Sequence, residues 1–348
     1  MHCELIVPGL LPAGAEARAA LEAFAAEGDR LPALELLLAR GRRTSDEATS
    51  LEKWLACAFD LDDETEIPAG ALTAAVFGES GGEGEWLRAD PAHLRLNRDQ
   101  LVLVPAGAFD IDSAEARALA DHLNGHFGGE LEFHPLLPDR WCVRVDPRLG
   151  AAGLRTETAA AVAGKDINRH LPTGEGCKRW HALLNEIQMV LHEHPVNEAR
   201  EARGEPPVNS VWLWGAGPLA RAAAATFQSV TSDDPLAQGL AQAAHIRYRD
   251  LTRDAGAWLA ALPEDGRQLL VLDGLRLPLA LGDWEAWRRR LAAYEAGWFA
   301  PLLAALKGGR IGMVTVTVPD GDEARSFETT RNDQRHFWRR PRTLATLL

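Results

Sequence analysis

Short apolar segments alternate with helix-like segments along the C-terminal third of the chain, and this alternation constrains the fold most. Segments with helical spacing of apolar residues, about 219–229, 255–261 and 283–306, follow the apolar runs in turn. A further short strand is expected at 4–7. This order is typical of an α/β fold, with a mainly parallel sheet covered on both faces. The apolar runs are 208–214, 244–248, 268–272 and 310–318.

The middle of the chain has a different order of expected strands and helices. Short strands are expected at 94–96 and 101–104, a helix ends near Phe127, and a hairpin spans 130–145. This order predicts a small α+β module inserted into the α/β core, with a further amphipathic helix at 178–194. We therefore predict an inserted domain at 86–194 and a discontinuous core made of 1–85 and 195–348.

Charge and hydropathy exclude some partners. The net charge of −13 argues against nucleic acid, because phosphate binding needs a positive surface. Apolar runs stay shorter than the roughly 18 residues of a membrane span, and no basic region precedes the first apolar run. We expect a cytoplasmic protein with no membrane partner, whose four separated cysteines are reduced thiols.

A glycine-rich turn follows the strand expected at 208–214. The residues from Gly215 to Ala220 match the dinucleotide pattern G-x-G-x-x-A, between a strand and a helix, so Gly215 and Gly217 are candidates for binding a dinucleotide. The alternative is a tight turn with Pro218 in the first helical position.

A polar link rich in asparagine and arginine precedes that strand. Arg200 and Arg203 share one helical face, and guanidinium groups suit carboxylates or phosphates. Surface arginines and a helix-terminal histidine are the structural alternatives. The candidate residues for binding a small anion are His93, His194, Asn197, Arg200, Arg203 and Asn209.

Carboxylates follow two of the expected strands. Asp273 comes after 268–272, while Asp320 and Asp322 come after 310–318, where catalytic carboxylates and metal ligands often lie. Aspartate is also common in turns. Ser45 is a candidate nucleophile at the start of a helix expected at 46–58, or else a helix cap.

Several stretches resemble the archaeal-type cofactor-independent phosphoglycerate mutases of the alkaline phosphatase superfamily. They include AGAFDIDSAEARALADHL, AGKDINRHLPTGEG and HPVNEAREARGEPPVNSVWLWGAGP. ADPAHLRLNRDQL, LNEIQMVLHEHPVN and the C-terminal FWRR resemble a bacterial, RpfE-like subgroup of regulatory proteins. The resemblance implies a three-layer αβα core with an inserted α+β domain. It also implies two divalent ions, Mn²⁺ or Mg²⁺, and a serine that is phosphorylated during turnover.

The residues expected for that chemistry are mostly replaced. The family's first strand ends in Asp-Gly, but this chain has Val7-Pro8-Gly9. The family's Asp-x-x-x-His becomes Asp273 followed by Leu277, and its Asp-His becomes Pro319-Asp320. A two-metal site needs most of its ligands.

We therefore predict a phosphoglycerate-mutase-like protein with a degenerate metal site and no metal cofactor. It would bind a small phosphorylated or carboxylate metabolite, or a protein partner, in a regulatory role. The alternatives are an active mutase or phosphatase that uses Mn²⁺ or Mg²⁺ at a rearranged site, and a dinucleotide-binding protein.

Overall fold

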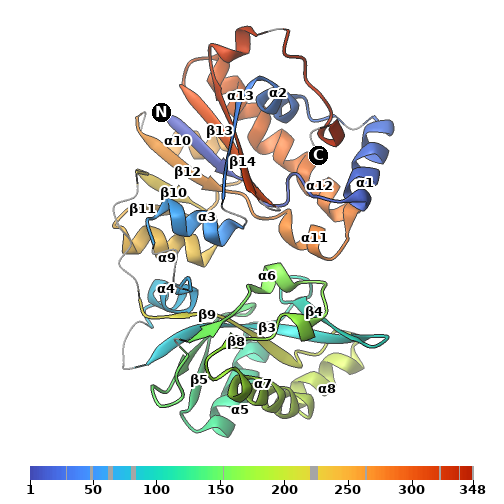
Figure 1. Ribbon diagram of the computed structural model, residues 1–348, viewed down its shortest axis with the longest axis vertical. Helices are drawn as coiled ribbons and strands as arrows, with labels where there is room; N and C mark the ends of the chain where they lie inside the picture. The colour runs from blue at the N-terminus through green and yellow to red at the C-terminus, as the bar shows by residue number, and fades with distance from the viewer. Residues whose placement is uncertain are drawn as a thin grey trace. The chain divides into compact units, whose positions relative to one another are not determined.

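The computed structural model divides the chain into two compact units, shown in Figure 1. Unit 1 consists of Met1–Asp62 and Ala222–Leu348, and unit 2 of Asp63–Arg221. The structure describes residues 1–28, 30–47, 50–61, 66–79, 84–151, 153–219, 226–262, 265–320, 323–336 and 338–346. None of the helices in these ranges combines the length and apolarity that crossing a bilayer requires.

Unit 1 is built on a seven-stranded sheet in the order β11-β10-β12-β1-β13-β14-β2. The strands from β11 to β13 are parallel, whereas β14 and β2 are antiparallel to their neighbours. The predicted α/β class with a mostly parallel sheet is therefore confirmed. The strands are β1 (His2–Ile6), β2 (Arg42–Asp46), β10 (Ser229–Thr231), β11 (Arg247–Arg249), β12 (Arg267–Val271), β13 (Met313–Asp320) and β14 (Glu323–Thr330).

Helices bury the apolar side chains of this sheet. Alternate residues of β1 (Cys3 and Leu5), and Val7 just after it, belong to one large buried cluster with side chains from α2, α12 and α13. The π-helix η2 joins α12 to α13. The helices of the unit are α1 (Ala15–Ala26), α2 (Pro32–Arg40), α3 (Leu51–Ala58), α9 (Pro235–Ala243), α10 (Ala255–Ala261), α11 (Arg276–Ala280), α12 (Trp284–Tyr294), η2 (Glu295–Phe299), α13 (Ala300–Lys307), η3 (Asp333–Arg335) and η4 (Leu344–Thr346).

Unit 2 contains an antiparallel sheet in which β4, β3, β6 and β5 lie side by side and β9 also pairs with β3. Helices α5 and α7 pack with this sheet in a second buried cluster. Its elements are α4 (Ala69–Val76), β3 (Glu85–Asn97), β4 (Gln100–Pro105), α5 (Ser113–Phe127), β5 (Leu131–Leu137), β6 (Arg140–Val145), β7 (Leu154–Arg155), α6 (Ala159–Val162), η1 (Ile167–Arg169), β8 (Thr173–Gly174), α7 (Cys177–His192), α8 (Pro195–Ala202) and β9 (Ser210–Gly217).

Two sequence expectations are wrong because of long-range strand pairing. The apolar run at 208–214 forms β9, which pairs antiparallel with β3 in unit 2 and not with the parallel core sheet. The compact units divide near residues 62 and 222, and the residues of the predicted inserted domain, 86–194, lie within unit 2. Residues 42–46 form β2 against β14, and Ser50 accepts the hydrogen bond that caps α3. Ser45 is therefore neither a helix cap nor part of a helix.

The glycines of the predicted dinucleotide turn lie within β9, against the start of α4. Gly215 has a φ of 68°, and a Cβ there would lie 2.6 Å from Cβ of Ala69. A Cβ on Gly217 would lie 3.2 Å from Cβ of Pro68. A dinucleotide-binding fold requires a parallel strand before the glycine-rich turn, but β9 pairs antiparallel with β3. The expected dinucleotide site at Gly215 and Gly217 is therefore wrong for the described residues. Ala220 and most of the expected helix at 219–229 lie outside them.

We predict that Gly215→Ala lowers the free energy of unfolding by roughly 1–3 kcal/mol, because the new methyl group meets Ala69 and φ is positive. Gly125→Ala is the matched control, since Gly125 lies inside α5 with open space around its Cα. In this control the free energy of unfolding should rise by about 0.5–1 kcal/mol. Urea unfolding measures both, and equal effects of the two substitutions would contradict the packing role of Gly215.

Candidate functional site

The carboxyl ends of the parallel strands bring two predicted residues to one edge of the core sheet. Asp273 follows β12 by two residues, and Asp320 ends β13. Between these strands lies β1, which continues into Val7, Pro8 and Gly9. In open α/β sheets ligands bind at this edge. We call these residues, together with Glu52 and Arg276 described below, the carboxyl edge.

Asp320 is tied to the turn after β1. Both of its carboxylate oxygens lie 2.8 Å from the backbone N of Gly9, which donates to them, and Leu11 donates a further backbone hydrogen bond. Burial raises the pKa of Asp320, while these hydrogen bonds act in the opposite direction. Gly9 has a φ of 79°, and a Cβ there would lie 3.2 Å from the backbone of Leu275. The turn therefore requires glycine.

A guanidinium group supplies positive charge at the same edge. Arg276, at the start of α11, forms an ion pair with Glu52 of α3 at 2.7 Å, and the two side chains are only 18% and 7% exposed. Burial opposes the charged form, but the carboxylates of Glu52, Asp273 and Asp234 outweigh it and raise the pKa of Arg276. This arginine stays protonated at any physiological pH.

The turn after β12 is held by Tyr294. Its hydroxyl oxygen accepts a hydrogen bond from the backbone N of Gly274 at 3.0 Å, and burial raises the pKa of Tyr294 to about 12. The side chain of Arg290 passes close to the same glycine, since a Cβ on Gly274 would lie 3.4 Å from Nε of Arg290. Arg276 and Arg290 are thus both near the Asp273-Gly274 turn.

Ser45 reaches the same edge but not the same place. Ser45 lies in the exposed strand β2, where it pairs with Arg325 of β14. Strand β2 is four strands from β12 in the sheet. Neighbouring strands are roughly 4.8 Å apart, so Ser45 and Asp273 are separated by about 19 Å. The structure does not bring them together as a nucleophile and its neighbouring carboxylate.

The sequence predicts no metal cofactor, and Asp273, Asp320 and Asp322 are the candidate ligands only for the alternative of a metal-dependent enzyme. Asp322 lies outside the described residues. Within the described ranges no group of three or more His, Cys, Asp or Glu side chains is arranged to hold a metal ion.

The polar link from His194 to Asn209 forms hydrogen bonds within unit 2. Asn197 donates to the carbonyl oxygens of Leu191 and Val208 at 2.7 and 2.9 Å and accepts from the N–H of Val208. Asn209 bonds to both backbone groups of Leu94, as a neighbouring strand would. These amides fasten the link to the sheet.

Arg200 is the most deeply buried charged residue of the link, with 1% of its surface exposed. Its guanidinium donates to the carbonyl oxygens of Pro206 and Asp110, both at 2.8 Å, and pairs with Glu115 at 2.5 Å. The more exposed Arg203 also pairs with Glu115, and with Glu205.

The two predicted histidines also have structural partners. Nδ1 of His93 lies 3.0 Å from the carbonyl oxygen of Pro207. Nδ1 of His194 accepts from the N–H of Val196 and caps α8, while its ring contacts the ring of His122. Burial lowers the pKa of both His93 and His194. All six residues predicted to bind an anion thus lie in unit 2, and each is engaged within it.

Comparison with known proteins finds a family-model match that falls within unit 2. The family model described as "2,3-bisphosphoglycerate-independent phosphoglycerate mutase" matches residues 69–197. A probable mutase of this kind from Geobacter sulfurreducens is 35% identical over 154 residues, which are 44% of this chain and 38% of that protein. One from Methanosarcina barkeri is 34% identical over 148 residues, 40% of this chain and 36% of that protein. The matches thus span less than two fifths of these relatives' length.

A solved structure has a similar fold over nearly the whole chain. The PH0037 protein from Pyrococcus horikoshii superposes with a TM-score of 0.54 at 15% identity, covering 94% of this chain and 87% of that one. The chain is therefore an α/β protein of this fold class with a second, antiparallel unit. Its residues 69–197 are related in sequence to the 2,3-bisphosphoglycerate-independent phosphoglycerate mutases, which confirms the predicted family resemblance.

Sequence reasoning missed Gly9, Glu52 and Arg276 at the carboxyl edge. A signal was present for Gly9, because Pro8-Gly9 directly follows a strand. Nothing local marked Glu52 and Arg276 as a pair, since 224 positions separate them and Glu52 lies in the first turn of an ordinary amphipathic helix.

We predict that Asp320→Ala lowers the free energy of unfolding by roughly 2–4 kcal/mol, because it leaves the N–H groups of Gly9 and Leu11 without their acceptor. Asp250→Ala, at an exposed position of unit 1, should change it by less than about 0.5 kcal/mol. Urea unfolding compares them. A similar small loss for both would show that Asp320 does not hold the turn.

We also predict that Arg200→Lys costs roughly 2–4 kcal/mol of folding stability, because an ammonium group cannot reach both carbonyl oxygens and Glu115 together. The more exposed Arg203→Lys should cost less than about 1 kcal/mol. Thermal unfolding of both variants measures the difference. Equal stabilities would contradict a structural role specific to Arg200.

Proposed function

We propose that this chain is a phosphoglycerate-mutase-like protein that binds a small phosphorylated or carboxylate metabolite at its carboxyl edge. It does so in a regulatory role and without two-metal phosphoryl transfer. The observation that carries the proposal is the engagement of Asp320 by the backbone of Gly9, with Arg276 as the cation beside Asp273. The relatives' names describe mutases, and the family similarity supports descent from such a scaffold.

The described residues of the carboxyl edge do not fit a pair of divalent ions. Asp320 is held by the N–H groups of Gly9 and Leu11, and burial raises its pKa, which disfavours the ionised form that binds metal. Arg276 is a fixed positive charge within the same group of carboxylates, so it repels a second cation. We therefore derive no step that passes through a metal ion.

Two guanidinium groups suit an anionic ligand. Arg276 and Arg290 both lie near the Asp273-Gly274 turn, and guanidinium forks bind carboxylate and phosphate oxygens well. Glu52, Asp234 and Asp273 offset part of this positive charge. The expected affinity is accordingly modest, with a Kd on the order of 0.1–1 mM, which suits a sensor of an abundant metabolite.

We predict that 3-phosphoglycerate binds with this affinity in calorimetric titrations and that EDTA leaves the Kd unchanged. Arg276→Met should weaken binding at least about 10-fold, the loss expected for one charge-assisted contact. The exposed Arg253→Met is the matched control and should bind like the parent protein.

Arg276→Met leaves the buried carboxylate of Glu52 without its ion-pair partner. The double variant Arg276→Met with Glu52→Gln, which removes that charge as well, is therefore measured beside it. Binding that requires Mn²⁺, or interconversion of 2- and 3-phosphoglycerate with Mn²⁺, would overturn the proposal in favour of an active mutase. A complete lack of binding would exclude a small metabolite as the ligand of the carboxyl edge and would favour a protein partner.

A further inference from the structure

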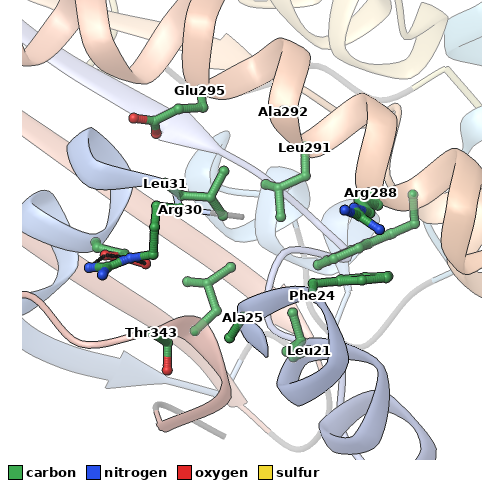
Figure 2. A pocket seen from close by; sticks show the side chains of 13 residues that line it. Leu21, Phe24, Ala25, Arg30, Leu31, Arg288, Leu291, Ala292, Glu295 and Thr343 are labelled. Atoms are coloured by element: carbon green, nitrogen blue, oxygen red, sulfur yellow. Dashed lines mark hydrogen bonds and ion pairs between the residues drawn. The ribbon is translucent and has the colours of Figure 1, made fainter. Parts of the chain in front are cut away.

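An apolar cavity, here called the second candidate site, lies within unit 1 and is lined by residues of α1, α2 and α12. Figure 2 shows it between α1, α12 and the segment that carries Thr343. It holds about 620 Å³ of space, including solvent at its mouth. Its walls are mainly apolar, and they contain Leu21, Phe24, Leu31, Trp287, Leu291 and Leu344.

The charged groups around the cavity already neutralise one another. Arg30 pairs with Glu35 at 2.7 Å, and Arg288 pairs with Glu27 at 2.5 Å while lying over the ring of Phe24. The carboxylate of Glu295 accepts from the N–H groups at the start of α2. A charged ligand would have to break one of these pairs or leave its own charge in an apolar wall without a partner.

One end of the cavity is polar. Figure 2 shows Glu295 and Arg30 on one side and Arg288 on the other, with leucine side chains between them. Each carboxylate oxygen of Glu295 uses one of its two lone pairs on a backbone N–H, so each retains capacity to accept another hydrogen bond. Arg30 is 57% exposed and has five N–H donors. A hydroxyl group can donate to the carboxylate of Glu295 or accept from the guanidinium of Arg30.

We infer that this cavity binds an uncharged small molecule with an apolar body and one hydroxyl group. Glu295 lies at the start of the π-helix η2, and π-helical turns in α-helices occur frequently at functional sites. Nothing in the inference depends on the metabolite proposed for the carboxyl edge.

Three probes with the same ring system test the inference by calorimetric titration: 2-naphthol, its hydroxyl-free analogue 2-methoxynaphthalene, and the anion 2-naphthoate. We expect saturable binding of 2-naphthol at one site per chain. The anion should bind at least 10-fold more weakly, and the methoxy analogue several-fold more weakly. No binding of 2-naphthol, or tighter binding of 2-naphthoate, would overturn the inference.

Variants place the binding in the cavity. Ala25→Phe fills the cavity from α1 and should abolish binding of 2-naphthol. Ala23→Phe makes the same change on the exposed side of α1 and should preserve it. Ala292→Phe fills the cavity from α12 and serves as the second test if Ala25→Phe unfolds. Undiminished binding to a folded Ala25→Phe or Ala292→Phe variant would contradict the assignment.

Discussion

The hydrogen bonds between the carboxylate of Asp320 and the N–H of Gly9 join the ends of two central strands in unit 1. The carbonyl oxygen of Gly9 in turn accepts from the indole of Trp287 at 2.8 Å, so the same turn positions α12. Trp287 also lines the second candidate site. The carboxyl edge and one wall of that cavity therefore depend on one turn, and this turn is possible only because residue 9 is glycine.

The two units carry different parts of the evidence on function. The residues that the family model matches, 69–197, lie in unit 2, where the polar link from His194 to Asn209 is engaged in hydrogen bonds that hold α8 and β9 to the sheet. The carboxyl edge lies in unit 1, outside the residues that this family model matches. This division accords with our proposal of a regulatory protein on a mutase-like scaffold, because folding and catalysis depend on different residues.

Local sequence patterns predicted most of the fold. Apolar runs led to β1, β12 and β13, and helical periodicity led to α2 and α7, with errors of a few residues at the ends. The patterns failed at β9, because an apolar run does not reveal which sheet a strand joins. They also failed at β2, whose sequence RRTSD is exposed and polar and forms a strand only through its pairing with β14. At the site, strand ends predicted where Asp273 and Asp320 lie, but Gly9, the partner of Asp320, and Glu52, the partner of Arg276, come from distant parts of the chain.

We propose that a guanidinium group and backbone N–H donors, not metal ions, balance the carboxylates of the carboxyl edge. Electron paramagnetic resonance of free Mn²⁺ during a titration of the protein tests it directly. We predict that the signal of free Mn²⁺ stays at its protein-free intensity at protein concentrations up to about 100 μM, corresponding to a Kd in the millimolar range or weaker. Loss of the signal with a stoichiometry of two ions per chain would contradict the account.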